Sequence, residues 1–82
     1  DEALPLYKRA LTIREHALGP NHHEVAASLH PLGLLYHAKG RHNEALALLQ
    51  RALAIYERTL GQKHPDTELC RRNLKACQKS IR

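Results

Sequence analysis

The chain has no tryptophan, phenylalanine or methionine, and three tyrosines are its whole complement of Phe, Trp and Tyr. A folded core must therefore be built from Leu, Ala, Ile and Tyr. No apolar run approaches the roughly 20 residues of a membrane-spanning helix, and no charged-then-apolar leader is present. The 82 residues allow one domain at most, near the size at which a single core is marginal. A composition of 43% hydrophobic and 26% charged residues excludes a disordered chain.

Cysteine is also scarce, and Cys70 and Cys77 stand seven residues apart on a predicted helix. Two helical turns separate their Cα atoms by about 10 Å, which is too far for a disulfide. Reduced thiols without a signal sequence predict a cytoplasmic protein.

The net charge of +5 is localised at one end of the chain. Residues 1–68 carry eight Lys/Arg and eight Asp/Glu, which cancel. The excess follows Leu69 and consists of Arg71, Arg72, Lys75, Lys79 and Arg82. The last predicted helix is therefore basic, whereas the body of the chain is neutral.

A repeat of 42 residues organises the chain. Residues 1–40 aligned with residues 43–82 give 13 identities, 12 of them within the first 22 pairs. The shared frame is E-A-L-x-L-x-x-R-A-L-x-I-x-E-x-x-L-G-x-x-H, which begins at Glu2 and again at Glu44. Self-similarity at this period indicates stacked supersecondary units rather than one globular core.

Apolar residues recur at three- and four-residue steps within each unit, and no segment alternates as a half-buried strand does. The chain is therefore predicted to be all-α. The four expected helices are approximately 2–18, 23–39, 43–60 and 65–80.

Residues near the expected helix ends support these boundaries. Asp1 and Asn43 are predicted N-caps, and Gly19 and Gly61 follow the last Leu of a stripe, where a left-handed residue closes a helix. Gly40 is expected to stop the second helix. Pro65 suits a first helical position, with Asp66 and Glu68 near the positive end of the dipole.

The middle of the chain carries a second set of regularly spaced residues: Leu29, Leu32, Gly33, Tyr36, Gly40, Ala45, Leu49, Ala52 and Leu53. This spacing matches the signature of the tetratricopeptide repeat family, which the chain resembles, and the 42-residue period is similar to the kinesin light chain and nephrocystin type. The resemblance covers essentially the whole chain and implies an α-α superhelix of antiparallel helical hairpins. Gly33, Ala45 and Ala52 are expected where paired helices approach closely, and Tyr36 is expected to pack with its hydroxyl at the edge.

The resemblance divides residues 1–82, a single array fragment, into unequal parts. Residues 1–22 form the second helix of an incomplete repeat, residues 23–64 one complete repeat, and residues 65–82 a C-terminal capping helix. We expect the chain to be a piece of a longer array that ends at this cap. The uncovered apolar face of the first helix is expected to be an exposed patch or to be covered by another copy of the chain.

Two departures from the family pattern concern single positions. His42 stands where the family usually has an aromatic residue. Pro31 lies inside the second helix, where its ring collides with the carbonyl of residue 27. We predict a kink or widened turn between Ala27 and Pro31; the alternative is a helix that begins late, at His30.

The fourth helix departs from the pattern more widely. Arg71, Lys75 and Gln78 occupy the places of Leu29, Gly33 and Tyr36. Polar residues at positions that normally bury against a following helix predict a solvent-facing cap. Leu69, Leu74 and Cys77 are expected to pack inward, and Cys70 to be partly buried.

The seven histidines show no four-residue helical pair, and the thiols lie on another helix without a CxxC. We therefore predict no metal site and no cofactor. His22 and His64 are expected to hydrogen-bond the backbone near the next helix start. No catalytic arrangement or phosphate loop is recognisable, so the chain is predicted not to be an enzyme.

The predicted function is a non-catalytic protein-interaction scaffold. In tetratricopeptide arrays the first helix of each repeat lines a concave groove, and its ligand positions carry over onto two helices. Positively charged side chains in the groove lining favour an acidic peptide or partner segment. Arg72 in particular is able to bind a carboxylate bidentately. The carried-over positions are Ala27, His30, Leu34, His37 and Ala38 on the second helix, and Leu69, Arg72, Ala76, Lys79 and Ser80 on the fourth.

Three alternatives to an acidic-peptide groove stay open, two of them for the basic helix and one for the chain as a whole. Lys and Arg near a helix C-terminus favour the dipole and keep a cap soluble. An anionic surface, nucleic acid or lipid, is a second reading, although the stretch lacks interleaved aromatic residues. A third is a structural spacer without a ligand.

Overall fold

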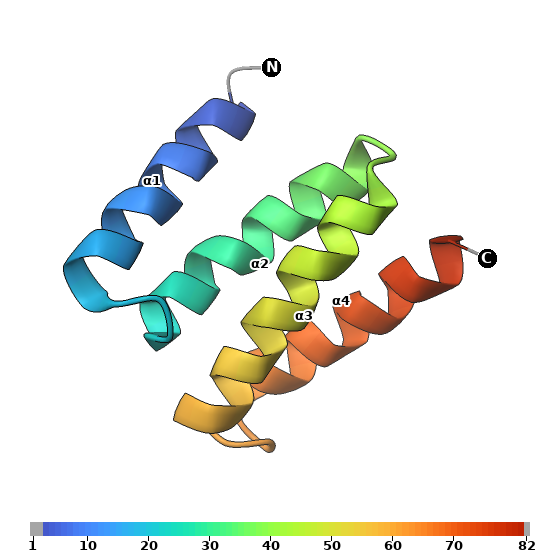
Figure 1. Ribbon diagram of the computed structural model, residues 1–82. Helices are drawn as coiled ribbons and strands as arrows, with labels where there is room; N and C mark the ends of the chain where they lie inside the picture. The colour runs from blue at the N-terminus through green and yellow to red at the C-terminus, as the bar shows by residue number, and fades with distance from the viewer. Residues whose placement is uncertain (1–2, 82) are drawn as a thin grey trace.

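The computed structural model describes residues 3–81, which form four α-helices and, within that range, no strand (Figure 1). The all-α prediction is confirmed. Each helix end that lies in the described range falls within one residue of its expected position. The helices are α1 (Ala3–Leu18), α2 (His23–Ala38), α3 (His42–Thr59) and α4 (Pro65–Ile81).

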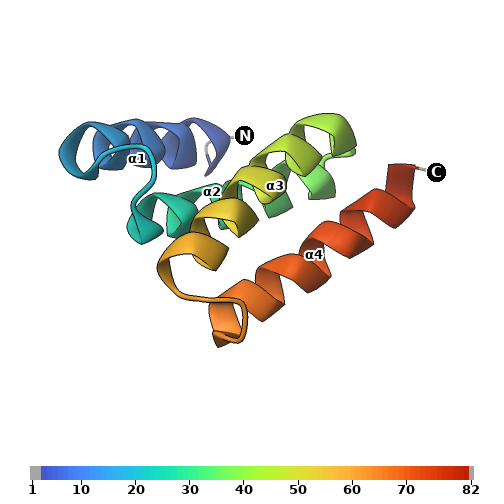
Figure 2. The ribbon, with the colours of Figure 1, turned by 60° about the horizontal axis from the view of Figure 1, so that its bottom comes forward.

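The helices pack as a succession of hairpins in two layers. Each helix contacts its neighbour along the chain, and α2 also contacts α4. Figure 2 shows α1 and α3 in one layer and α2 and α4 in the other. None of the helices between residues 3 and 81 is both long and apolar enough to cross a membrane.

The core lies between α2, α3 and α4. One buried cluster joins the start of α2 to the end of α3, and a second joins the end of α2 to the start of α3 and the end of α4. Helix α1 has no buried residue in its described range. The first cluster contains Val25, Ala26, Leu29, Ala52, Ile55, Tyr56 and Cys70, and the second Leu32, Tyr36, Ala45, Leu49, Leu74 and Cys77.

Small residues set the close approach of α2 and α3, as predicted. A Cβ atom added at Gly33 would lie 2.9 Å from Leu49 Cγ and 3.4 Å from the Ala45 carbonyl oxygen. Ala45 and Ala52 are fully buried. A larger side chain at Gly33 would therefore push the two helices apart.

The predicted helix ends are mostly confirmed. Gly19, Gly40 and Gly61 have φ angles of 90°, 81° and 89°, the left-handed region that glycine adopts without strain. Pro65 is the first residue of α4, with Asp66 and Glu68 in its first turn.

The predicted N-cap Asn43 is wrong, and Asp1 lies outside the described residues. Helix α3 begins at His42 with Arg41 at the N-cap, where no side chain caps the backbone. Arg41 instead donates to both carboxylate oxygens of Glu44, at 2.6 and 2.8 Å. This ion pair holds an acidic residue in the first turn, which offsets the missing cap.

The expected role of His22 and His64 is confirmed. The backbone N–H of Glu24 donates to His22 Nδ1, and that of Asp66 donates to His64 Nδ1, both at 3.1 Å. The two histidines occupy the same place in successive repeats, and each satisfies an amide at the start of the next helix.

Helix α2 runs without interruption through Pro31. The alternative of a late start at His30 is therefore wrong, because the helix begins at His23. The kink expected between Ala27 and Pro31 stays a prediction.

Two predictions for α4 need correction. Leu69 is 45% exposed rather than packed inward, and Cys70 is fully buried rather than partly buried. The crossing of α4 over α3 turns Cys70, Leu74 and Cys77 toward the core, whereas Leu69 precedes this stripe by one residue. Both cysteines are free, as predicted.

Candidate functional site

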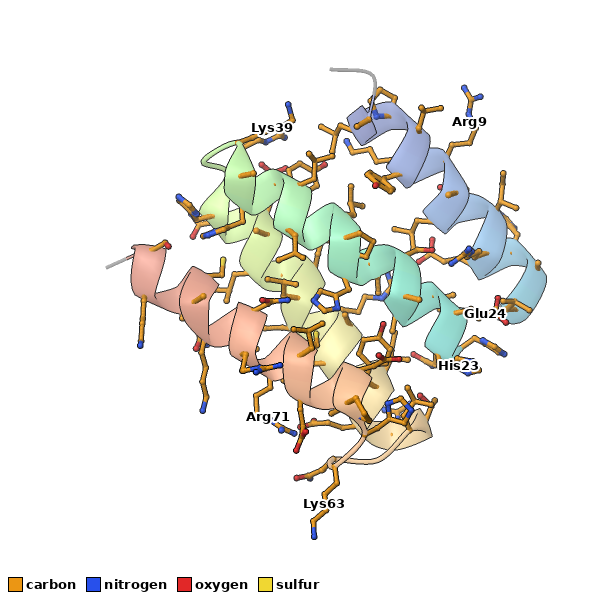
Figure 3. The ribbon with its side chains drawn as sticks, turned by 180° about the vertical axis from the view of Figure 1, so that it is seen from behind. Arg9, His23, Glu24, Lys39, Lys63 and Arg71 are labelled. Atoms are coloured by element: carbon orange, nitrogen blue, oxygen red, sulfur yellow. The ribbon has the colours of Figure 1, made fainter. Side chains whose placement is uncertain are left out.

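The predicted ligand positions lie on α2 and α4, the two helices in front in Figure 3. We call this surface the α2/α4 face. Nine of the ten positions reach solvent at least in part: Ala27, Leu34, Ala38, Leu69, Arg72, Ala76, Lys79 and Ser80 are exposed, and His37 is half-buried. His30 is the exception, with 8% exposure.

His30 joins the two helices of this face instead of presenting an imidazole to solvent. Its Nε2 lies 2.8 Å from Asn73 Nδ2 of α4, and its ring meets that of Tyr56 edge-on at 6.3 Å. Burial lowers the pKa of His30, although the carboxylate of Asp66 acts in the opposite direction. The ring is therefore kept neutral and serves as a link in the floor of the face.

The cations of the α2/α4 face differ in their ion pairing. Arg72 and Lys79 form no ion pair within residues 3–81. By contrast Arg71, labelled in Figure 3, pairs with Glu57 of α3 at 3.3 Å. A partner carboxylate can therefore bind Arg72 without breaking an existing pair.

A shallow hollow of about 320 Å³ lies along α4. Its lining includes Arg71 and Lys75, which stand 42 residues after Leu29 and Gly33. Those two residues are buried against α3, so the hollow occupies the place where a further helix would pack on α4. The full lining is Glu68, Arg71, Arg72 and Lys75.

A larger pocket of about 430 Å³ lies between α1 and α3, on the opposite layer, and was not predicted. The Tyr36 ring lies in its wall, with the Arg41 guanidinium 4.6 Å and Lys8 Nζ 5.7 Å from the ring centroid. Tyr36 was expected to pack with its hydroxyl at the edge, but the sequence does not indicate the spacing between α1 and α3. The lining comprises Lys8, Leu11, Thr12, Leu32, Tyr36, Glu44, Ala47 and Leu48.

The structure also assembles a cluster that the sequence reasoning missed. Side chains of His37, His42 and Cys77 place one potential metal-ligand atom each within 4.8 Å of the others. Spacing along single helices could not reveal this group, because its members come from α2, α3 and α4. Cys77 was excluded as lying on another helix, yet that helix packs beside the α2–α3 turn.

The buried thiols and phenol are held in their neutral forms. Burial raises the pKa of Cys70 to about 11 and that of Tyr56 to about 12, and it also raises the pKa of Cys77. A protonated thiol is a poor nucleophile. The environment of these groups is thus that of core residues.

Comparison with known families gives one clear result. A family model described as tetratricopeptide repeat matches residues 1–58 and again residues 25–81. No curated protein matches the chain. The two matches together span the four helices, so the chain belongs to the tetratricopeptide repeat family, whose repeats are non-catalytic protein-interaction modules.

Proposed function

We propose that this chain is a scaffold module that holds a carboxylate-bearing segment of a partner protein on the α2/α4 face. The observation that carries the proposal is the combination of exposed apolar side chains with cations that form no ion pair among residues 3–81, on adjacent helices. Leu34 of α2 and Leu69 of α4 are 38% and 45% exposed, and Arg72 and Lys79 are exposed on α4.

The chemistry of this surface favours one class of ligand. Exposed leucines give up water on contact with an apolar side chain, whereas Arg72 offers a planar fork that matches a carboxylate. A segment that alternates Leu-like and acidic residues satisfies both. The similarity in period to kinesin light chain repeats also supports an acidic partner.

Selection of short segments from a displayed peptide library tests the proposal. We expect the selected peptides to be acidic, and their affinity for the double variant Arg72→Glu/Lys79→Glu to fall at least about tenfold, since each lost charge-assisted contact is worth about 1.5–3 kcal/mol. Fluorescence anisotropy measures the affinity, and circular dichroism checks that the variant folds.

The matched control is Arg58→Glu/Lys63→Glu, which makes the same charge change at exposed residues of α3 and the α3–α4 turn. Equal loss of affinity in both variants would show a general charge effect and sink the proposal. Duplex DNA added to the wild-type chain tests the anionic alternative, which requires a fall of about 0.9 log unit in affinity per log unit of salt for each phosphate contact.

We also propose that a second copy of the chain covers the exposed face of α1. Ile13 and Tyr7 are 60% and 42% exposed, whereas their counterparts one repeat later, Ile55 and Leu49, are 4% and 0% exposed. The face that α3 buries is therefore open on α1. An apolar helix face of this kind is characteristic of an association surface.

A further inference from the structure

The cluster of His37, His42 and Cys77 is the feature that the proposed function leaves unused. His37 lies in the last turn of α2, His42 is the first residue of α3, and Cys77 is in α4. The two imidazoles are half-buried and the thiol is fully buried. Three elements thus bring two nitrogen donors and one sulfur donor to one sheltered point.

The repeat does not require two of these residues, His37 and Cys77. One unit away in the 42-residue frame, Lys79 stands in the place of His37 and Leu35 in the place of Cys77. Leu35 shows that an aliphatic side chain suits the position of the thiol. The family pattern therefore accounts for a ring at position 42, but not for the imidazole of His37 and the thiol of Cys77 that meet it here.

The distances suit a tetrahedral metal ion. His37 Nδ1 and His42 Nδ1 are 2.9 Å apart, and the three donor atoms lie within 4.8 Å of one another. Tetrahedral Zn²⁺ with its usual bond lengths requires about 3.3 Å between two nitrogens and about 3.6 Å between nitrogen and sulfur. Side-chain shifts that part the two nitrogens by about 0.4 Å and bring the sulfur closer by at most about 1.2 Å would place an ion between the three donors.

We propose that His37, His42 and Cys77 bind a Zn²⁺ ion that fastens α4 to the α2–α3 turn. Two imidazoles and one thiolate form a donor set that suits Zn²⁺ in proteins, and water takes the fourth position of such three-ligand sites. The Cys77 thiol donates to the His42 carbonyl oxygen at 3.6 Å. On binding, that thiol releases its proton to solvent and the thiolate sulfur bonds the metal.

A second histidine cluster does not offer the same site. His22, His23 and Glu24 also place donor atoms within 4.8 Å, but they are consecutive residues at the surface. His22 Nδ1 already accepts the Glu24 backbone N–H. Metal binding through that nitrogen would remove the cap of α2, whereas binding through His37, His42 and Cys77 breaks no helix cap.

Titration of the full reduced chain with Zn²⁺, and with Co²⁺ as a spectroscopic probe, tests the proposal. We expect one equivalent to bind, with a thiolate-to-cobalt charge-transfer band in the near ultraviolet. The melting temperature should rise by about 10 °C or more when free Zn²⁺ is about 100 times its Kd. Cys77→Ala should abolish the band, and His42→Gln should weaken Zn²⁺ binding at least tenfold.

Matched controls identify the site. Cys70→Ala removes the other buried thiol, and His23→Gln removes a histidine of the second cluster; both should bind Zn²⁺ as the wild-type chain does. Absence of the cobalt band in the wild-type chain overturns the proposal, and this result does not depend on any variant folding. Loss of the band in Cys70→Ala, or of Zn²⁺ binding in His23→Gln, assigns the metal to another place and equally overturns it.

Discussion

At the scale of single residues, His30 shows how a position expected on a surface becomes part of the interior. Its spacing along α2 places it in the predicted ligand stripe, but Asn73 of α4 lies 2.8 Å from its Nε2. The neighbouring aromatic ring of Tyr56 covers one side. The imidazole therefore connects two helices and is held neutral by burial.

The neutral state of His30 predicts a loss of stability in acid. Burial lowers the pKa of His30 in the folded chain, with Asp66 opposing the change. In the unfolded chain the same imidazole takes up its proton near pH 6.5. The contribution of neutral His30 to the free energy of unfolding is therefore fully present above about pH 6.5. This contribution is lost as the pH falls below that value toward the lower pKa of His30 in the folded chain. Urea unfolding at pH 7.5 and pH 5 measures the loss.

The variant His30→Gln isolates this effect, because glutamine can still bond Asn73 but does not titrate. We expect its free energy of unfolding to fall less between pH 7.5 and pH 5 than that of the wild-type chain. His16→Gln, a change at an exposed histidine of α1, should keep the full wild-type loss. An identical pH dependence in all three chains would contradict the assignment to His30.

At the scale of helices, local signals in the sequence predicted most of the helix ends. Glycines at left-handed positions, Pro65 at a first turn and the paired histidines His22 and His64 all act on backbone within a few residues of themselves. Asn43 misled because the ion pair of Arg41 and Glu44 starts α3 one residue earlier. Such competition between two neighbouring start signals is decided by side-chain geometry.

Removal of either histidine cap should lower the stability of the folded chain by a similar amount. His22→Ala and His64→Ala each leave one amide without its imidazole acceptor, so each should lower the free energy of unfolding by about 1 kcal/mol. Chemical denaturation at pH 7.5 measures the change, with His16→Ala as the control. If neither cap variant differs from that control, the two hydrogen bonds at 3.1 Å do not contribute to stability.

At the scale of the whole molecule, the sequence predicted that helical hairpins stack. It did not predict which side chains of different helices meet where the helices cross. The 42-residue frame predicts hairpins because its apolar stripes recur. The pocket beside Tyr36, the exposure of Leu69 and the meeting of Cys77 with His37 and His42 depend on angles between helices. Those angles arise from packing of several side chains at once, such as Leu49 against Gly33.

The open face of α1 predicts self-association. If a second copy covers Ile13 and Tyr7, sedimentation velocity should show a dimer that forms with increasing concentration. The double variant Ile13→Glu/Tyr7→Glu should remain monomeric, because burying two unpaired carboxylates opposes association. Arg9→Glu changes charge on the same helix (Figure 3) and should still associate; a monomeric wild-type chain at every concentration would contradict the proposal.

Chemical-shift mapping of the isotopically labelled chain tests the proposed binding face most directly. The probe is an acidic peptide selected on the wild-type chain. We expect its largest amide shifts to fall on α2 and α4, around Leu34, Leu69, Arg72 and Lys79. Shifts confined to the pocket between α1 and α3, around Lys8 and Leu48, would contradict the assignment of the interaction surface to the α2/α4 face.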